Sequence, residues 1–177
     1  MANFGYNKPL FILPFDHRAS FSKTILGIYG EPSLRDKERI IELKQIIYDA
    51  FKVATASGVP KDEAAILVDE GYGGDILKDA NAHGFVTCLT VEKSGQEVFD
   101  FEYDDFKEHI NAIKPTFIKA LVRYNPEGDK EKNKIQCERL KILSDFAHSE
   151  GYKFLIEPLI LPTADQLYRV GDSHDRY

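Results

Sequence analysis

Cysteine is scarce in this sequence, and its spacing excludes two kinds of site. Cys88 and Cys137 are the only cysteines, and they lie too far apart to match the short spacings of metal-binding or redox motifs. Outside such motifs a cysteine behaves as a small apolar side chain. We therefore expect both to be free thiols that are buried or partly buried.

Long apolar runs and an excess of basic residues are also absent. No run approaches the roughly 18 residues that span a bilayer, and the first residues, MANFGYNKPL, lack the pattern of a signal peptide. The 29 acidic and 23 basic residues give a formal net charge of −6. Because nucleic-acid binding needs a basic surface, we expect no nucleic-acid partner. Without a signal-peptide pattern or an apolar run of membrane length, we expect a cytoplasmic protein that does not bind a membrane.

Common nucleotide and metal motifs are missing as well. The turn GYGG (71–74) does not match the dinucleotide fingerprint, and no Walker A lysine follows a glycine-rich turn. The five histidines form no pair at the helical spacing typical of zinc sites. The sequence therefore predicts no metal and no cofactor.

The sequence does contain a repeated alternation of short apolar segments and longer mixed segments. Each apolar segment is followed by a helical pattern, which is typical of βα units in a parallel sheet. No linker or change of composition divides the chain, so we predict a single domain over 1–177. The predicted strands are 11–15, 64–70, 85–93, 117–124 and 153–160.

Two long helices are predicted from apolar residues that recur about every 3.6 positions. The first covers about 34–57 with Ser33 as its N-cap, and the second covers about 130–150 with Gly151 as its stop. The residues predicted to face the core are Ile40, Leu43, Ile47, Ala50, Phe51 and Ala54 in the first helix, and Ile135, Leu140, Ile142, Leu143, Phe146 and Ala147 in the second.

Charged side chains lie at or near the C-terminal end of every predicted strand. In a parallel α/β fold these ends share the rim where ligands bind. A doubly wound sheet, which the chain length favours, would bring only some of them together, whereas a TIM barrel would bring all of them to one centre. The charges therefore favour the (β/α)8 barrel. They are Asp16 and Arg18, Asp69 and Glu70, Glu92 and Lys93, Lys119 and Arg123, and Glu157.

Some of these residues have purely structural interpretations. Asp69 or Glu70 could cap the helix that follows, and Arg18 and Glu92 could form ion pairs at the rim. Lys119 is harder to explain in this way, because it lies within FIKALV, where an unpaired ammonium would be costly to bury.

A lysine in apolar surroundings is a candidate catalytic residue. Desolvation lowers the pKa of such a lysine, which lets it act as an acid, a base or a nucleophile toward a carbonyl. Carboxylates at Asp16 and Glu157 could then exchange protons with a substrate hydroxyl. Together these groups suit carbon–carbon cleavage next to a ketone.

Five segments of the chain resemble a known bacterial family in sequence and in order. They are LFILPFDHRASF, ILVDEGYGGDIL, VEKSGQEVFDFEY, KALVRYNPEGD and KFLIEPLIL. This family consists of aldolase-like barrels, found alone and as the C-terminal domain fused to 5-dehydro-2-deoxygluconokinase in inositol catabolism. More distantly, the segments are similar to the class I tagatose-1,6-bisphosphate aldolases.

The resemblance implies a TIM barrel, a lyase that cleaves a phosphorylated keto-sugar through a lysine Schiff base. For the inositol branch the substrate would be 6-phospho-5-dehydro-2-deoxygluconate, which gives dihydroxyacetone phosphate and malonate semialdehyde. The catalytic candidates are Asp16, Lys119 and Glu157, and the substrate-binding candidates are Arg18, Asp69, Glu70, Lys93 and Arg123.

The chain departs from that family in two respects. It looks like the first five of eight βα units, so the usual TIM phosphate site after strands seven and eight is missing. The Schiff-base lysine of these aldolases lies on a sixth strand, and only five βα units are recognisable here, so Lys119 is not assigned that role. We expect open barrel edges that are covered by self-association or by another contact. Two alternatives to the aldolase stay open: a non-catalytic sugar-phosphate-binding domain, and a doubly wound magnesium-dependent phosphotransfer domain built on Asp16 and Asp69.

Overall fold

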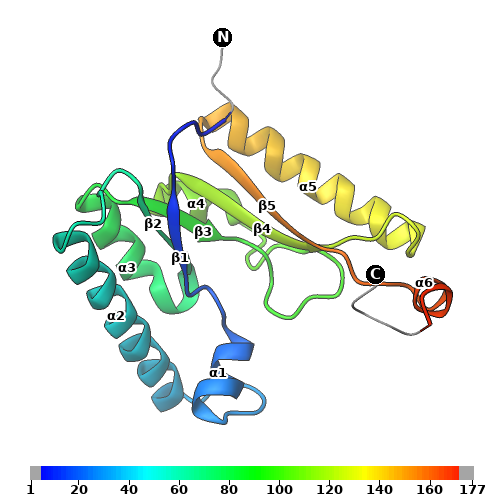
Figure 1. The fold of residues 1–177 in the computed structure, drawn as a ribbon, viewed down its shortest axis with the longest axis horizontal. Coiled ribbons are helices and arrows are strands. Elements are labelled where there is room, and N and C mark those ends of the chain that lie inside the picture. The colour runs from blue at the N-terminus through cyan, green and yellow to red at the C-terminus, as the bar shows by residue number, and fades with distance from the viewer. Residues whose placement is uncertain (1–4, 172–177) are drawn as a thin grey trace.

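The computed structural model describes residues 5–171, and its centre is one parallel sheet (Figure 1). The strands follow one another in chain order, β1-β2-β3-β4-β5, and each pairs in parallel with the next. All five predicted strands are confirmed, with small shifts at their ends. They are β1 (Phe11–Pro14), β2 (Ala64–Asp69), β3 (Val86–Thr90), β4 (Phe117–Arg123) and β5 (Lys153–Leu159).

Helices connect the strands, and the two long ones lie where the apolar period predicts them. Ser33 forms a capping box with Asp36 at the start of the first, and Gly151 ends the second in the left-handed region at φ 81°. No helix within residues 5–171 is long and apolar enough to cross a membrane. The helices are α1 (Ala19–Leu26), α2 (Leu34–Ala56), α3 (Glu70–Ala82), α4 (Phe106–Ile113), α5 (Lys130–Glu150) and α6 (Ala164–Arg169).

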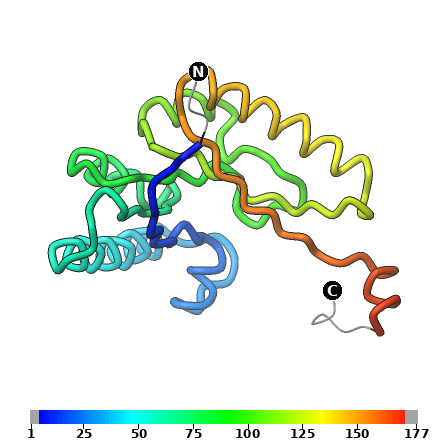
Figure 2. Tube along the Cα trace, turned by 45° about the horizontal axis from the view of Figure 1, so that its top comes forward, coloured from blue at the N-terminus to red at the C-terminus, as the bar shows by residue number. Residues whose placement is uncertain are grey.

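The sheet is curled into half a barrel (Figure 2). In a flat sheet β1 and β4 would lie about 14 Å apart, three strand spacings. Here Lys119 of β4 contacts Asp16, just after β1, at 2.9 Å, and Tyr6 packs on Phe117 of β4 with ring centroids 5.2 Å apart. The sequential strand order lacks the reversal of a doubly wound sheet. The fold is therefore an α/β half-barrel of five parallel strands.

The two faces of the sheet differ in what covers them. Side chains of one parity, such as Ile66, Leu89 and Ile118, join the main core with apolar residues of the helices. Side chains of the other parity, such as Leu67 and Phe117, form a smaller cluster on the concave face. Because strand side chains alternate, Lys119 and Arg123 also point to the concave face.

The buried face of α2 differs from the prediction. Ile40 and Phe51 are buried as expected, but Ala50 and Ala54 are exposed. The helix instead buries Tyr48 and, unexpectedly, the fully enclosed Lys44. The helix is rotated toward these residues because each has a polar partner: Lys44 pairs with Asp69, and Tyr48 donates to Asp79 at 2.8 Å.

The prediction for α5 and Cys137 also needs correction. Leu143 and Ala147 are buried, but Ile135 and Ile142 are exposed, and α5 buries Asn133 and Gln136 in their place. Gln136 accepts from the Phe99 backbone and donates to the Arg123 backbone, so it holds the loop after β3 against β4. Cys88 is buried as expected, whereas Cys137 on the outer surface of α5 is exposed.

The free edges β1 and β5 lead to the first testable prediction. Both carry exposed apolar side chains, with Phe11 62% and Ile156 47% exposed. Unpaired strand edges of this kind favour association. We expect the apparent mass in sedimentation velocity to rise with protein concentration, and the double substitution Phe11→Lys and Ile156→Lys to suppress this rise. Ile25→Lys on α1, at a side chain 59% exposed, should leave it unchanged; a compact monomer at every concentration would contradict the prediction.

Candidate functional site

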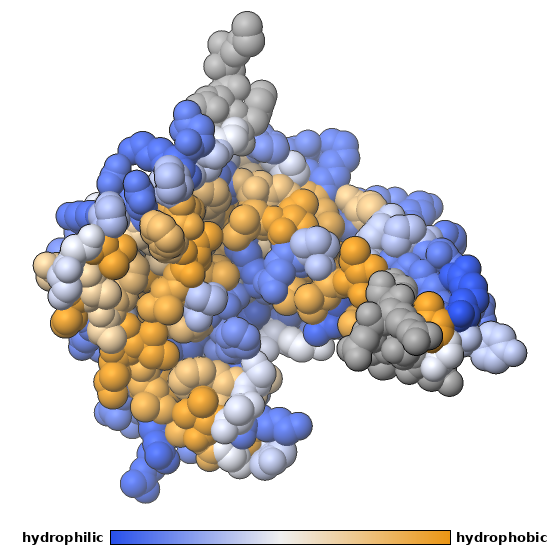
Figure 3. Space-filling model, viewed as in Figure 1, coloured by the Kyte–Doolittle hydropathy of each residue, from blue (hydrophilic) through white to orange (hydrophobic). Residues whose placement is uncertain are grey.

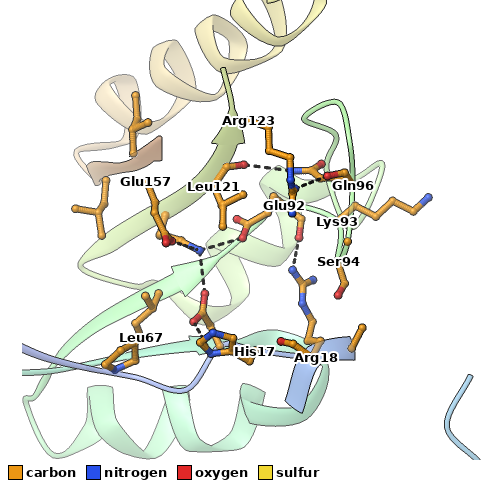
Figure 4. Close-up of a pocket in the computed structure, with 18 of the residues that line it drawn as sticks. His17, Arg18, Leu67, Glu92, Lys93, Ser94, Gln96, Leu121, Arg123 and Glu157 are labelled. Carbon is orange, nitrogen blue, oxygen red and sulfur yellow. Dashed lines mark hydrogen bonds and ion pairs between the residues drawn. The ribbon is translucent and has the colours of Figure 1, made fainter. Parts of the chain in front are cut away.

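A cavity of about 740 Å³ opens on the concave face, toward the C-terminal ends of the strands. Its apolar wall includes Ile12, Leu67 and Leu155, which come from three different strands. Its polar wall comes from β4, β5 and the segments that follow β1 and β3 (Figure 4). Figure 3 shows this side of the molecule, with apolar surface on either side of a polar strip.

Lys119 is the centre of the polar wall. Its Nζ atom lies 2.9 Å from Asp16 Oδ2, 3.0 Å from Glu92 Oε1 and 2.9 Å from Glu157 Oε2. The Lys119 side chain is 2% exposed, so the three carboxylates replace the water that an ammonium needs. An ammonium has three N–H donors, and each has an acceptor here. The sequence-predicted set Asp16, Lys119 and Glu157 is thus brought together around one nitrogen atom.

The charges around Lys119 overturn the expectation of a lowered pKa. Burial by itself would lower the pKa of Lys119, but the carboxylates of Glu92 and Asp16 and the hydrogen bond to Glu157 raise it above its ordinary value. No cation lies among its direct partners. The surroundings of Lys119 therefore favour its charged ammonium form.

The pKa values of Asp16 and Glu92 move in opposite directions, although both residues bind the same ammonium. Burial would raise the pKa of Asp16, but Lys119 and a 2.7 Å hydrogen bond from Thr90 lower it below its usual range. For Glu92, burial dominates and raises the pKa in spite of Lys119. Such a separation is typical of sites where one carboxyl holds a proton and another does not. Glu157, whose side chain is 49% exposed, completes the set.

Glu92 is the functional candidate that sequence reasoning missed. It lies near the end of the predicted strand 85–93, where the sequence leaves a rim ion pair open as a structural alternative to a site residue. Strand β3 ends at Thr90, and Glu92 continues its direction through a bridge to Phe101. The available signal was parity: Glu92 shares the parity of Thr90 and therefore its concave face.

The predicted cationic residues lie at the mouth of this cavity. Arg18 donates to Glu102 at 2.8 Å and to the backbone oxygen of Glu92 at 2.6 Å. Arg123 donates to the backbone oxygen of Gln96. Both guanidinium groups thus hold the loop after β3 in place, while the Lys93 side chain extends away from Glu92 and Glu157 (Figure 4).

Asp69 and Glu70 are not brought to this cavity. Asp69 is buried, pairs with Lys44 and caps α3 by accepting from the Tyr72 backbone at 2.9 Å. Glu70 lies 2.9 Å from His109 and lines a second, adjoining cavity of about 330 Å³, which shares Arg18 with the first. Asp16 and Asp69 therefore have different ammonium partners, and residues 5–171 contain no group of three potential ligands that could hold a metal ion.

Comparison with known proteins assigns the chain to a family but indicates no activity for it. No curated protein matches the sequence. One family model, described as an uncharacterized protein conserved in bacteria (DUF2090), matches residues 5–173. The match covers almost the whole chain, and the chain therefore belongs to this conserved bacterial family.

Proposed function

We propose that the chain carries the acid–base part of a class I aldolase-like site, which cleaves a phosphorylated keto-sugar such as 6-phospho-5-dehydro-2-deoxygluconate. One observation carries the proposal: Asp16, which follows β1, meets Lys119 of β4 and Glu157 of β5 in one cavity. The resemblance to aldolase-like barrels supports the same three residues. Acyclic keto-sugars are small enough for a cavity of about 740 Å³.

The three residues have distinct tasks in this proposal. Once the Schiff base has formed, a base removes the proton of the hydroxyl group beside the breaking bond, and the electrons of that bond pass to the protonated Schiff base. Glu157 suits this task because its side chain is half-exposed at the cavity and can exchange protons with solvent. Asp16, whose pKa is lowered, stays ionised and fixes Lys119. Lys119 supplies a fixed positive charge where negative charge develops on the substrate.

The amine that forms the Schiff base is not assigned to a residue of this cavity. Schiff-base formation requires a neutral amine, and Lys119 is held as an ammonium by three carboxylates. Lys93 lines the cavity but points away from the acidic cluster. This agrees with the family resemblance, which assigns the Schiff-base lysine to a further strand.

The phosphate group of the substrate would bind at the mouth. Arg18, Lys93 and Arg123 provide positive charge there, together with the backbone of Ser94 and Gly95. With a net charge of −6 the chain as a whole repels anions, so such a local cluster is needed. Planar guanidinium groups also suit phosphate geometry.

A non-catalytic sugar-phosphate-binding domain is the second candidate. It is favoured by the saturation of Lys119, since none of its three donors is free to engage a substrate before a carboxylate moves. A magnesium-dependent phosphotransfer site on Asp16 and Asp69 has less support, because the two carboxylates bind different lysines.

Binding of dihydroxyacetone phosphate tests the proposal. We expect calorimetry to show one site, and Arg123→Gln to weaken binding about tenfold, since a charge-assisted hydrogen bond is lost. Arg169→Gln on α6, which pairs with Glu127 away from the cavity, should leave the affinity unchanged. Absence of binding would contradict both candidates. Reduction with borohydride in the presence of the ligand should leave Lys119 unmodified in mass spectra, and a label there would overturn its assignment as an ammonium.

A further inference from the structure

One oxygen atom of the acidic cluster has no partner. Glu92 is 5% exposed, and its Oε2 atom makes no hydrogen bond within the described part of the chain. The backbone N–H groups of Glu92 and Leu121 favour the charged form of the carboxyl, but neither forms a hydrogen bond to Oε2. An unsatisfied buried carboxylate oxygen is costly and calls for an explanation.

We infer that Glu92 is a specificity-determining residue, whose Oε2 atom binds a hydroxyl group of the ligand. The inference rests on the proposed function, because it assigns a contact within the same cavity. It goes beyond that function by naming the part of the ligand that is recognised and the residue that recognises it. Within the described residues, Glu92 Oε2 is the buried carboxylate oxygen of the cluster that lacks a partner, whereas Asp16 Oδ2 accepts from both Thr90 and Lys119.

The Glu92 carboxyl is held in place before any ligand binds. Its Oε1 atom accepts from Lys119 at 3.0 Å, and its backbone oxygen accepts from Arg18 at 2.6 Å. With one carboxyl oxygen and the backbone fixed, the second oxygen has one defined position. A preorganised acceptor of this kind gives specificity without an ordering cost when the ligand binds.

The charges that surround Glu92 define which end of the ligand reaches it. Asp16 from the end of β1, Glu157 from β5 and Glu92 itself face a single ammonium, Lys119 of β4, so the inner cavity carries more acidic than basic groups. A phosphate would be repelled there and attracted to Arg18 and Arg123 at the mouth. The ligand therefore enters with its neutral, hydroxylated end inward.

A hydroxyl group also suits both protonation states of Glu92. Burial raises the pKa of Glu92, so the carboxyl takes up a proton more readily than its neighbour Asp16. A hydroxyl can donate to a carboxylate and can accept from a protonated carboxyl. Neither an ammonium nor a keto oxygen has both abilities.

Two ligands that differ by one hydroxyl group test the inference. Dihydroxyacetone phosphate and hydroxyacetone phosphate share the ketone and the phosphate, but the second lacks the free hydroxyl. We expect calorimetry on the wild-type chain to show at least about tenfold tighter binding of the first, because a site built around a hydroxyl penalises its loss. Glu92→Ala should reduce this preference to about twofold or less, and the isosteric Glu92→Gln should retain part of it.

The controls separate this inference from the proposed function. Glu97→Gln removes the same charge from the same loop at a side chain that is 78% exposed, and it should leave the preference unchanged. If the wild-type chain binds both ligands equally, or if folded Glu92→Ala keeps the full preference, the inference is wrong and the proposed function stands. If the wild-type chain binds neither ligand, both the inference and the proposed function are wrong. Circular dichroism shows whether each variant is folded. If Glu92→Ala does not fold, the comparison of Glu92→Gln with Glu97→Gln decides, and an unchanged preference in Glu92→Gln would contradict the inference.

Discussion

Lys119→Met is expected to lower the free energy of unfolding by about 3–5 kcal/mol at pH 7, the usual cost of removing one partner from a buried ion pair. Methionine fills similar space, so the loss is electrostatic and not a cavity effect. The substitution leaves Asp16 and Glu92 buried without their cation, and Glu157 without its partner. Urea unfolding followed by circular dichroism measures the change.

The pH dependence of this variant follows from the directions of the pKa shifts. In the wild type the pKa of Asp16 is lowered, so its contribution to stability is present above its unfolded pKa and is lost as the pH falls through its folded pKa. Without Lys119 the folded pKa values of Asp16 and Glu92 both rise, and the folded state then binds more protons than the unfolded state. The stability of Lys119→Met should therefore fall as the pH rises from about 4 to 7.

A surface lysine provides the control. Lys132→Met removes an exposed pair with Glu97 and should leave the urea midpoint unchanged at both pH values. Wild-type stability in Lys119→Met at pH 7 would contradict the assignment of Lys119 as the centre of the cluster. A deficit that does not shrink toward pH 4 would show that the loss comes from packing and not from uncompensated carboxylates.

The sequence was informative about the site wherever a charge interrupted an apolar strand. Lys119 lies inside FIKALV and could be buried only with partners, and the parallel order of the strands brought Asp16 and Glu157 to the same rim. Their convergence on one centre was predicted, but the direct contact of Asp16 with Lys119, 103 positions away, could not be predicted from the sequence. It depends on how strongly the sheet curls, and no local pattern reports that curvature.

The residues that sequence reasoning missed are those whose neighbours come from a different element. A lysine next to the predicted apolar face of a helix is normally assigned to solvent, and the burial of Lys44 depends on its pairing with Asp69 of β2. Asp69 and Glu70 are adjacent acids, and the sequence does not show which of them caps the helix that follows. In the structure Asp69 is the N-cap of α3, and Glu70 contacts His109. The period of the helix was predictable, but the phase of its buried face was set by these polar pairs.

Disruption of the buried pair of Lys44 and Asp69 is also expected to lower the free energy of unfolding strongly. Lys44→Met alone should cost about 3–5 kcal/mol, because it leaves Asp69 charged and enclosed. The double variant Lys44→Met and Asp69→Asn should recover most of this loss. Asparagine can still accept from the Tyr72 backbone as an N-cap, and a methionine sulfur packs well against the nearby rings of Phe21 and Tyr72. A double-mutant cycle in urea measures the coupling, and purely additive effects would contradict the pairing.

The two single variants should also respond to pH in opposite directions. Burial already raises the pKa of Asp69 and lowers that of Lys44 in the wild type, and removal of the partner increases each shift. In Lys44→Met the folded state then binds more protons than the unfolded state, so stability falls as the pH rises above the unfolded pKa of Asp69. In Asp69→Asn the lysine has a folded pKa below its unfolded value, so the folded state binds fewer protons and stability rises with pH. The double variant contains neither charge and should show neither slope, because the two slopes have their origin in a single enclosed ion pair.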